Sequence, residues 1–175
     1  MRRLMLLRHA KSDWSSDGQG DIDRPLAPRG RAVALRMGRY MAQHGLTPDR
    51  VLVSNAQRTR ETWVLVAPAF AQTPASHSEP RLYGAGPKAL LDVIHETLPD
   101  THTLLLVGHN PGLQDLAGLM TVSGDDDARY RLQGKFPTAA LAVIDFATDD
   151  WREANASTGR LDRFVTPQLL RLEAE

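Results

Sequence analysis

The sequence predicts an α/β fold: a three-layer sandwich in which a mainly parallel central sheet carries helices on both faces. Two observations predict it. Short apolar runs of strand length recur along the chain, and longer segments with helical periodicity lie between them. Continuously apolar strands are typical of a parallel sheet, because its crossover helices cover both faces.

The predicted strands are the apolar runs at residues 4–7, 51–53, 103–107 and 141–146. The clearest predicted helix runs from Pro28 to His44, because its apolar side chains fall on one stripe and Gly45 follows where a left-handed C-terminal cap is expected.

Three more helices are predicted between the later strands. Ser54 or Asn55 is a suitable cap for the first, which turns Trp63, Val64, Val66, Ala67 and Phe70 inward. The next opens at Pro87, in the first turn where proline is tolerated, and the last begins near Pro111.

Two polar segments, Ser12 to Pro25 and Ser123 to Thr138, lack periodicity and are predicted to be surface loops. The chain shows no internal repeat and no linker composition. We therefore expect residues 1–175 to form one domain, within the usual size range.

The charge balance and the lack of cysteine argue against several classes of function. The 21 basic residues balance the 21 acidic ones, so net charge gives no reason to expect nucleic acid or an anionic membrane surface as a partner. Residues 1–40 nevertheless carry nine basic side chains against four Asp, which suits a small anionic ligand.

Cysteine is absent, which excludes disulfides and thiolate chemistry. The apolar run at 4–7 is too short for a signal peptide or a spanning helix, and we expect a cytoplasmic protein.

Polar clusters follow three of the predicted strands. Arg8 and His9 follow the first, the segment 54–62 with Arg58 follows the second, and the segment 108–111 with His109 follows the third. Ligands of open α/β sheets bind at the carboxyl ends of the strands, so these side chains should converge. Arginine forks and imidazoles favour a phosphate-like dianion over a planar carboxylate.

Each of these residues also has an ordinary structural interpretation. An Arg-His pair is common on protein surfaces, and His109 lies among turn-forming residues. Arg58 could pair with Glu61 on its own helix. Their joint placement at three strand ends is what favours the functional interpretation.

Other common chemistries lack their motifs. No His and carboxylate spacing typical of a metal site occurs, and the acidic run Asp125 to Asp127 is more typical of a solvated loop. The G-x-S-x-G elbow of serine hydrolases is absent. We therefore expect no metal and no cofactor.

Four segments resemble the histidine phosphatase superfamily, also called phosphoglycerate mutase-like, and within it the SixA-type phosphohistidine phosphatases. They are LLRHAKSDW (6–14), DRPLAPRGR (23–31), SNAQRTRET (54–62) and LVGHNPGL (106–113). The resemblance implies a phosphoglycerate mutase-like fold, with His9 as the phosphate-accepting nucleophile. It implies that Arg8, Arg58 and His109 bind and polarise the phosphoryl group.

The sequence departs from the family pattern in three places. The usual Arg-His-Gly ends in Ala10, a variant associated with SixA-like members. Mutase-type relatives carry a phosphate-contacting Asn near the position of Ser15, and we expect Ser15 to make a weaker contact with the substrate. They also carry a glutamate general acid, and Glu79 lies too early in the chain to be assigned this role.

The expected function is hydrolysis of protein phosphohistidine through a phosphorylated His9, with Arg24 and Lys11 as further candidate substrate contacts or as ordinary loop residues. The partner would be a phosphorylated protein or a small phosphorylated metabolite. One alternative is a phosphomonoesterase or mutase acting on sugar phosphates or phosphoglycerate. Another is a catalytically silent module that binds phosphoproteins.

Overall fold

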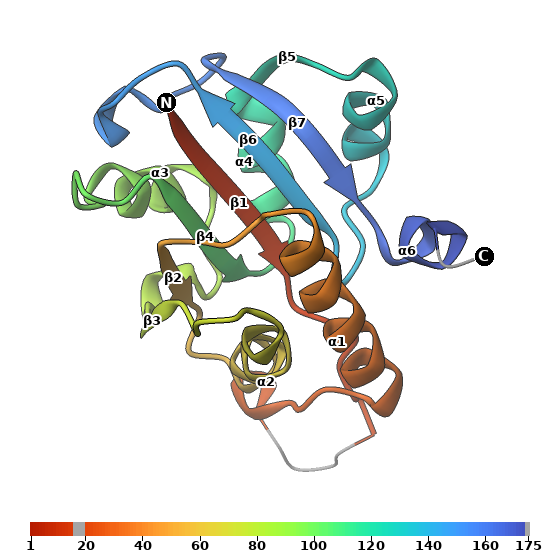
Figure 1. Cartoon of the computed structure of the whole chain (residues 1–175). Helices are drawn as coiled ribbons and strands as arrows, with labels where there is room; N and C mark the ends of the chain where they lie inside the picture. The colour runs from red at the N-terminus through yellow and green to blue at the C-terminus, as the bar shows by residue number, and fades with distance from the viewer. Residues whose placement is uncertain (16–19, 174–175) are drawn as a thin grey trace.

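The fold is built on a twisted sheet (Figure 1), and most of the buried side chains of its central strands are apolar. The structure is a computed structural model that describes residues 1–15 and 20–173. Within these residues, seven strands lie in the order β3-β2-β4-β1-β6-β7-β5. They are β1 (Arg2–Arg8), β2 (Arg50–Val53), β3 (Ala75–Ser78), β4 (Thr103–Gly108), β5 (Thr121–Gly124), β6 (Leu141–Phe146) and β7 (Gly159–Val165).

The sheet is mainly parallel, which confirms the predicted α/β class. β1 pairs in parallel with β4, β4 with β2, and β2 with β3. β6 runs antiparallel to both of its neighbours, β1 and β7. The four predicted strands correspond to β1, β2, β4 and β6.

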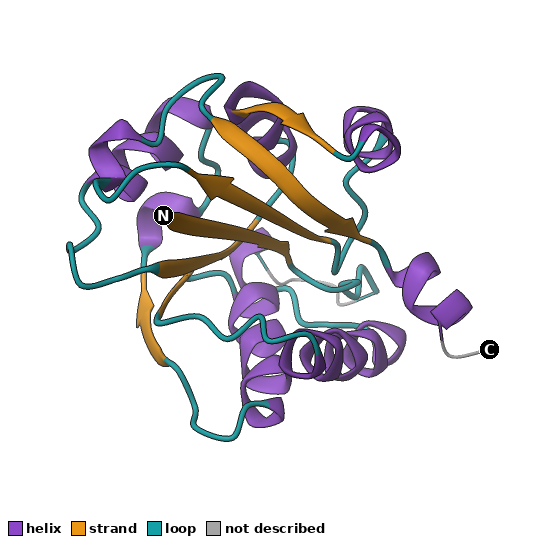
Figure 2. Cartoon of the chain, turned by 45° about the horizontal axis from the view of Figure 1, so that its top comes forward, coloured by secondary structure: helices purple, strands orange, loops and turns teal. Residues whose placement is uncertain are grey.

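Helices cover both faces of the sheet (Figure 2). The described helices are α1 (Pro28–Gln43), α2 (Gln57–Val66), α3 (Pro87–His95), α4 (Gly112–Met120), α5 (Asp126–Gly134) and α6 (Pro167–Glu173). Short 3-10 turns occur at η1 (Asp21–Asp23), η2 (Ala67–Ala69), η3 (Pro80–Leu82) and η4 (Trp151–Glu153). Among the described residues, every helix is too short or too polar to cross a lipid bilayer.

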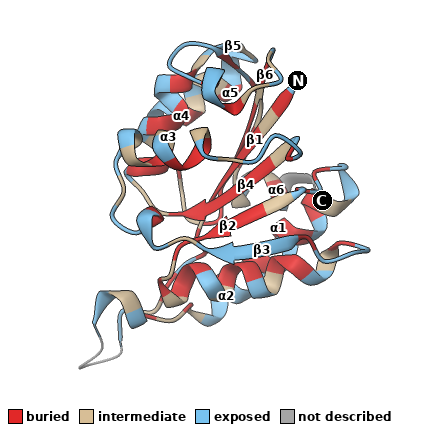
Figure 3. Ribbon diagram, turned by 90° about the vertical axis from the view of Figure 1, so that its left-hand side faces the viewer, coloured by how far each residue is buried: buried red, intermediate tan, exposed pale blue. Residues whose placement is uncertain are grey.

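Two cores lie on the two sides of the sheet. One is formed with side chains of α1, α2 and α6, and the other with side chains of α3, α4 and α5. Leu4 and Leu6 of β1 face the second core, while Met5 and Leu7 face the first. This alternation explains why β1 is buried along its length, whereas the edge strand β3 is exposed (Figure 3).

The helix predicted from Pro28 ends as expected. Gly45 adopts a φ of 68°, its N–H donates to the carbonyl of Ala42 at 3.3 Å, and the N–H of Leu46 donates to Met41 at 2.8 Å. These two bonds form a Schellman cap, which a glycine with positive φ accommodates without a clash.

Several local predictions were wrong. The acidic run predicted as loop begins α5: the Asp125 side chain accepts from the N–H of Ala128 at 2.8 Å, and Asp126 and Asp127 lie in the first turn. Carboxylates are favourable there because of the helix dipole. The loop predicted over 12–25 contains η1 and a bridge between Ser12 and Leu26, and its residues 16–19 lie outside the described residues.

The start of α2 also differs from the prediction. Its N-cap is Ala56, with no side-chain cap, in place of Ser54 or Asn55. Val64 is 66% exposed and does not turn inward, while Trp63 and Val66 do.

Candidate active site

Three neighbouring strands bring the candidate site together. β2, β4 and β1 lie side by side and parallel, and their carboxyl ends lead into Ser54, His109 and His9. The register pairs Arg8 with Gly108, and the N–H of His9 donates to the carbonyl of Gly108 at 3.1 Å. The rings of His9 and His109 consequently lie 5.4 Å apart between centroids.

The His9 imidazole is buried and held in one tautomer. Its Nδ1 lies 2.7 Å from the carbonyl oxygen of Ala10, which can only accept, so Nδ1 carries the proton and Nε2 keeps its lone pair. Burial first, and then the neighbouring cationic groups, lower the pKa of His9 to about 3, although the bond to Ala10 opposes the shift. The ring is therefore neutral at physiological pH, with the lone pair of Nε2 free.

Arg8 ends β1 beside His9. Its Nη1 donates to the carbonyl of Phe136 at 2.9 Å, which ties the guanidinium to the loop between α5 and β6. Burial, and then the charge of Arg58, lower its pKa, but an arginine remains protonated. Nε of Arg8 is a buried donor with no acceptor among the described residues.

Arg58 lies in the first turn of α2 and is 6% exposed. Its Nη2 lies 3.4 Å from Nδ1 of His109, and its own Nε has no acceptor in the described part of the chain. Because arginine can only donate, Nδ1 of His109 accepts. The other ring nitrogen, Nε2, then donates to the hydroxyl of Ser54 at 2.7 Å.

His109 is neutral in this arrangement. Burial and then the charge of Arg58 lower its pKa to about 4, while the carboxylate of Asp21 opposes the shift. The site thus combines two guanidinium cations with two neutral imidazoles. A dianion placed among them would raise the pKa of His109 again, and the protonated ring could then donate hydrogen bonds from both nitrogens.

The comparisons with known proteins agree with this chemistry. Residues 4–82 match the family profile of the histidine phosphatase superfamily, branch 1. A solved structure from Agrobacterium tumefaciens, assigned as a SixA phosphohistidine phosphatase, is 31% identical with a TM-score of 0.79, covering 95% of this chain and 99% of that chain. The chain belongs to the histidine phosphatase superfamily.

Two further relatives extend the match along the chain. A solved structure from Nakamurella multipartitia, also assigned as a SixA phosphohistidine phosphatase, is 27% identical to this chain with a TM-score of 0.81. The match covers 95% of this chain and 96% of that chain. The uncharacterized protein Rv1276c of Mycobacterium tuberculosis H37Rv is 38% identical over 164 residues, which are 93% of this chain and all of the relative. Superfamily membership and the SixA-type likeness support phosphatase activity on a phosphorylated substrate.

Two side chains in this histidine phosphatase site, Asp21 and Tyr83, were not predicted from the sequence. Asp21 in η1 accepts from Nη2 of Arg58 at 3.2 Å and from Arg24 at 3.0 Å, and its backbone carbonyl accepts from Nη1 of Arg58 at 2.8 Å. The hydroxyl of Tyr83 also donates to Asp21, and the Tyr83 ring packs edge-on against His109. These donors, Tyr83 foremost, hold the pKa of Asp21 far below its usual range. The carboxylate is therefore ionised.

Two hydroxyls support the histidines from behind. Ser54 anchors His109, as described above. Thr62 accepts from the N–H of Ala10 at 3.0 Å and donates to the carbonyl of Arg58 at 2.7 Å, so it joins the His9 loop to α2. Both hydroxyls are wholly buried, and no local sequence signal marks either of them.

The weaker candidate contacts lie in different places. Arg24 is buried, and it bonds to Ser12 and Asp21 at the edge of the site. Ser15 is exposed, and its hydroxyl donates to Asp13 at 2.6 Å. Lys11 is exposed and lines a separate hollow beside α1.

The alternative interpretation of Arg58, an ion pair with Glu61 on its own helix, is not what the structure shows. Arg58 pairs with Asp21, and Glu61 pairs with Arg31 at 2.9 Å. Among the described residues, no group of three or more His, Cys, Asp or Glu side chains is placed to hold a metal ion. The expectation that no metal or cofactor is used stays a prediction.

Proposed function

We propose that this protein is a phosphohistidine phosphatase in which Nε2 of His9 attacks the phosphorus atom. The observation that carries the proposal is the fixed tautomer of His9: Nδ1 is bound to Ala10, and the free lone pair of Nε2 lies in a buried cationic cluster. An imidazole with a lowered pKa is unprotonated and available as a nucleophile.

The cationic groups around His9 would stabilise the phosphoryl oxygens. Arg8 and Arg58 each bring a buried Nε donor that has no acceptor among the described residues, and an anion can satisfy both. His109 lies beside Arg58 and would donate once it is protonated. Removing one preorganised donor of this kind costs about 2.7 to 4 kcal/mol in other enzymes.

The reaction consists of two in-line displacements. In the first, the lone pair of Nε2 forms a bond to phosphorus while the bond to the leaving group breaks. In the second, water attacks the phosphorus of phospho-His9, the P–N bond breaks, and inorganic phosphate and neutral His9 are released. Splitting one difficult displacement into two easier ones is the advantage of covalent catalysis.

The carboxylates near the site favour a leaving group that needs no acid. The Glu79 carboxylate is bound by the Arg81 guanidinium at 3.0 and 3.1 Å, which lowers its pKa, and Asp21 is ionised as well. Neither can donate a proton at neutral pH. A phosphorylated imidazole can leave as neutral imidazole when its own ring is protonated, whereas an alkoxide cannot leave easily without general acid catalysis worth about 10² to 10⁴-fold.

A phosphoenzyme assay tests the nucleophile. Brief incubation with a labelled aryl phosphate should give a label on His9 that is acid-labile and alkali-stable, as phosphoramidates are. His9→Ala should lose both label and turnover, whereas His77→Ala, which alters an exposed histidine of β3, should keep both. Turnover retained in His9→Ala, or an acid-stable label, contradicts the assignment.

A substrate series tests the specificity. With one preparation, kcat/KM should decrease in the order phosphohistidine peptide, aryl phosphate, alkyl phosphate, because the leaving groups become harder to expel in that order. If the alkyl ester is cleaved as fast as the phosphohistidine peptide, a metabolite phosphatase becomes the better assignment.

A further inference from the structure

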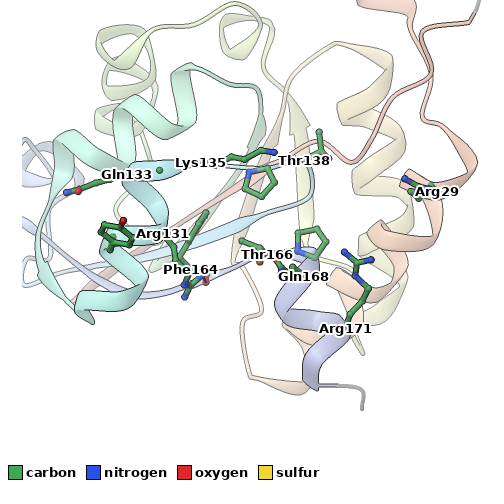
Figure 4. A pocket seen from close by; sticks show the side chains of 13 residues that line it. Arg29, Arg131, Gln133, Lys135, Thr138, Phe164, Thr166, Gln168 and Arg171 are labelled. Carbon is green, nitrogen blue, oxygen red and sulfur yellow. Dashed lines mark hydrogen bonds between the residues drawn. The ribbon is translucent and has the colours of Figure 1, made fainter.

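Two adjoining hollows lie beside the loop that supports Arg8. The first has a volume of about 850 Å³, and side chains of α5, α6, the α5–β6 loop and the start of α1 face it (Figure 4). The second, of about 360 Å³, shares Arg29, Thr138, Pro167 and Arg171 with the first. We call the two together the basic groove, after the cationic side chains that line it: Lys11, Arg29, Arg36, Arg131, Lys135 and Arg171.

The charge of the basic groove is unbalanced. None of the residues that line the two hollows is acidic. Within the described part of the chain, Arg131 has a carboxylate partner, Asp127 at 2.9 Å, and no ion pair reaches the other five. The whole chain carries equal numbers of acidic and basic residues, so this is a local excess of positive charge. Such a surface attracts an anionic partner.

The loop between α5 and β6 lines the basic groove and also contacts the candidate active site. The carbonyl of Phe136 accepts from Arg8, and the N–H of Ala139 donates to the carbonyl of His9 at 3.0 Å. Thr138, between these two residues, lines both hollows, and Lys11 is two residues from His9. A macromolecule that presents its phosphoryl group to His9 would therefore extend over the groove.

The shape of the groove favours a polypeptide over a small anion. Figure 4 shows the labelled cations Arg29, Arg131, Lys135 and Arg171 at different places around the first hollow, and they do not point to one common position. Apolar surface lies among them in the ring of Tyr130, which is 78% exposed. An acidic segment with interspersed apolar side chains matches this pattern.

We propose that the basic groove binds an acidic segment of the phosphorylated substrate protein. This inference rests on the proposed function, because it names the partner of the same site. The groove adds affinity to the complex and does not touch the reacting atoms. Its effect should therefore appear in KM for substrates that reach it, and should be absent for small substrates.

Matched peptides test the proposal. One carries a single phosphohistidine followed by about 12 residues rich in Asp and Glu, and the other has Asn and Gln in their place. The native protein should show a KM about 5- to 20-fold lower for the acidic peptide, and added salt should reduce this advantage. Arg29→Gln combined with Arg171→Gln should abolish it. Arg39→Gln combined with Arg160→Gln, two exposed arginines outside the groove, should preserve it.

The outcomes separate the two proposals. Equal KM values for the two peptides overturn the docking proposal and leave phosphohistidine hydrolysis standing. Cleavage of an aryl phosphate but of neither peptide overturns the proposed function. In that case, binding of a fluorescent, unphosphorylated acidic peptide to the native protein reports on the groove alone, and it should weaken in the Arg29 and Arg171 variant. Tighter binding of an oligonucleotide of equal charge, lost in the same variant, overturns the acidic protein partner.

Discussion

Replacing His9 with glutamine should flatten the acid dependence of stability. The pKa of His9 is about 3 in the folded protein, against about 6.5 for an unperturbed histidine. Between these values the unfolded chain binds a proton that the folded chain does not, so stability falls as the pH falls through this window. At pH 5, about 1.5 pH units below the unfolded pKa, the cost is about 2 kcal/mol at 1.36 kcal/mol per unit.

The assay is urea denaturation of the native protein and the variant at pH 7.5 and pH 5. The native protein should lose about 2 kcal/mol more of its free energy of unfolding than His9→Gln over this interval. Both proteins should lose some stability, because His109 also has a lowered pKa and its protonation in the unfolded chain likewise favours unfolding at low pH. The comparison uses the change with pH, so any constant effect of the substitution cancels.

His77→Gln serves as the control, because His77 is exposed on the edge strand and its removal should leave the native pH dependence unchanged. An equal loss in His9→Gln and the native protein would refute the reasoning, since His9 would then titrate alike in the folded and unfolded states. Vanadate or another phosphate-like dianion should reduce the free energy of unfolding that the native protein loses at low pH, because a bound dianion favours protonated imidazole in the site.

Four further predictions concern two glycines, the charge of Asp21 and the metal dependence of turnover. Gly30→Ala should destabilise the fold by about 1 to 3 kcal/mol in thermal or urea denaturation, because an added Cβ would lie 2.1 Å from the backbone oxygen of Lys11. Gly118→Ala, a helical position with open space around it, should instead stabilise by about 0.5 to 1 kcal/mol. Asp21→Asn removes a negative charge 3.2 Å from Arg58, so inorganic phosphate should inhibit aryl phosphate hydrolysis about fivefold more tightly; an unchanged inhibition constant contradicts this. Turnover should survive EDTA, and loss that is restored by a divalent metal would contradict the metal-free mechanism.

The strands β1, β2, β4 and β6 could be predicted from the sequence, and β3, β5 and β7 could not. β1 and β4 are buried on both faces and read as continuous apolar runs. β7 was not predicted because charged residues interrupt it. In the fold, Asp162 of β7 pairs with its neighbour Arg163 at 2.8 Å and lies 3.7 Å from Arg3 of β1. β3 is exposed at every position, so no apolar pattern marks it.

The convergence of the central four residues could also be predicted, because each directly follows a recognisable strand or opens the next helix. Asp21 and Tyr83 could not be found in this way. They lie 62 residues apart in the chain, and Asp21 meets Arg58 across 37 residues, through loops whose paths have no periodic signature. Tertiary structure alone creates that contact.

The parallel pairing of β1 and β4 sets the spacing of the two segments that carry His9 and His109. Neighbouring strands lie about 4.8 Å apart, and the two imidazoles inherit a comparable centroid separation of 5.4 Å. The backbone hydrogen bonds of the sheet set the spacing of the two strands, so side-chain substitutions near the site can turn the rings but do not change how far apart their backbones lie. An engineer who wishes to accommodate a larger reacting group would have to alter the loops and the approach to the site. Inserting one residue into either strand would turn its histidine to the opposite face of the sheet and dismantle the pair.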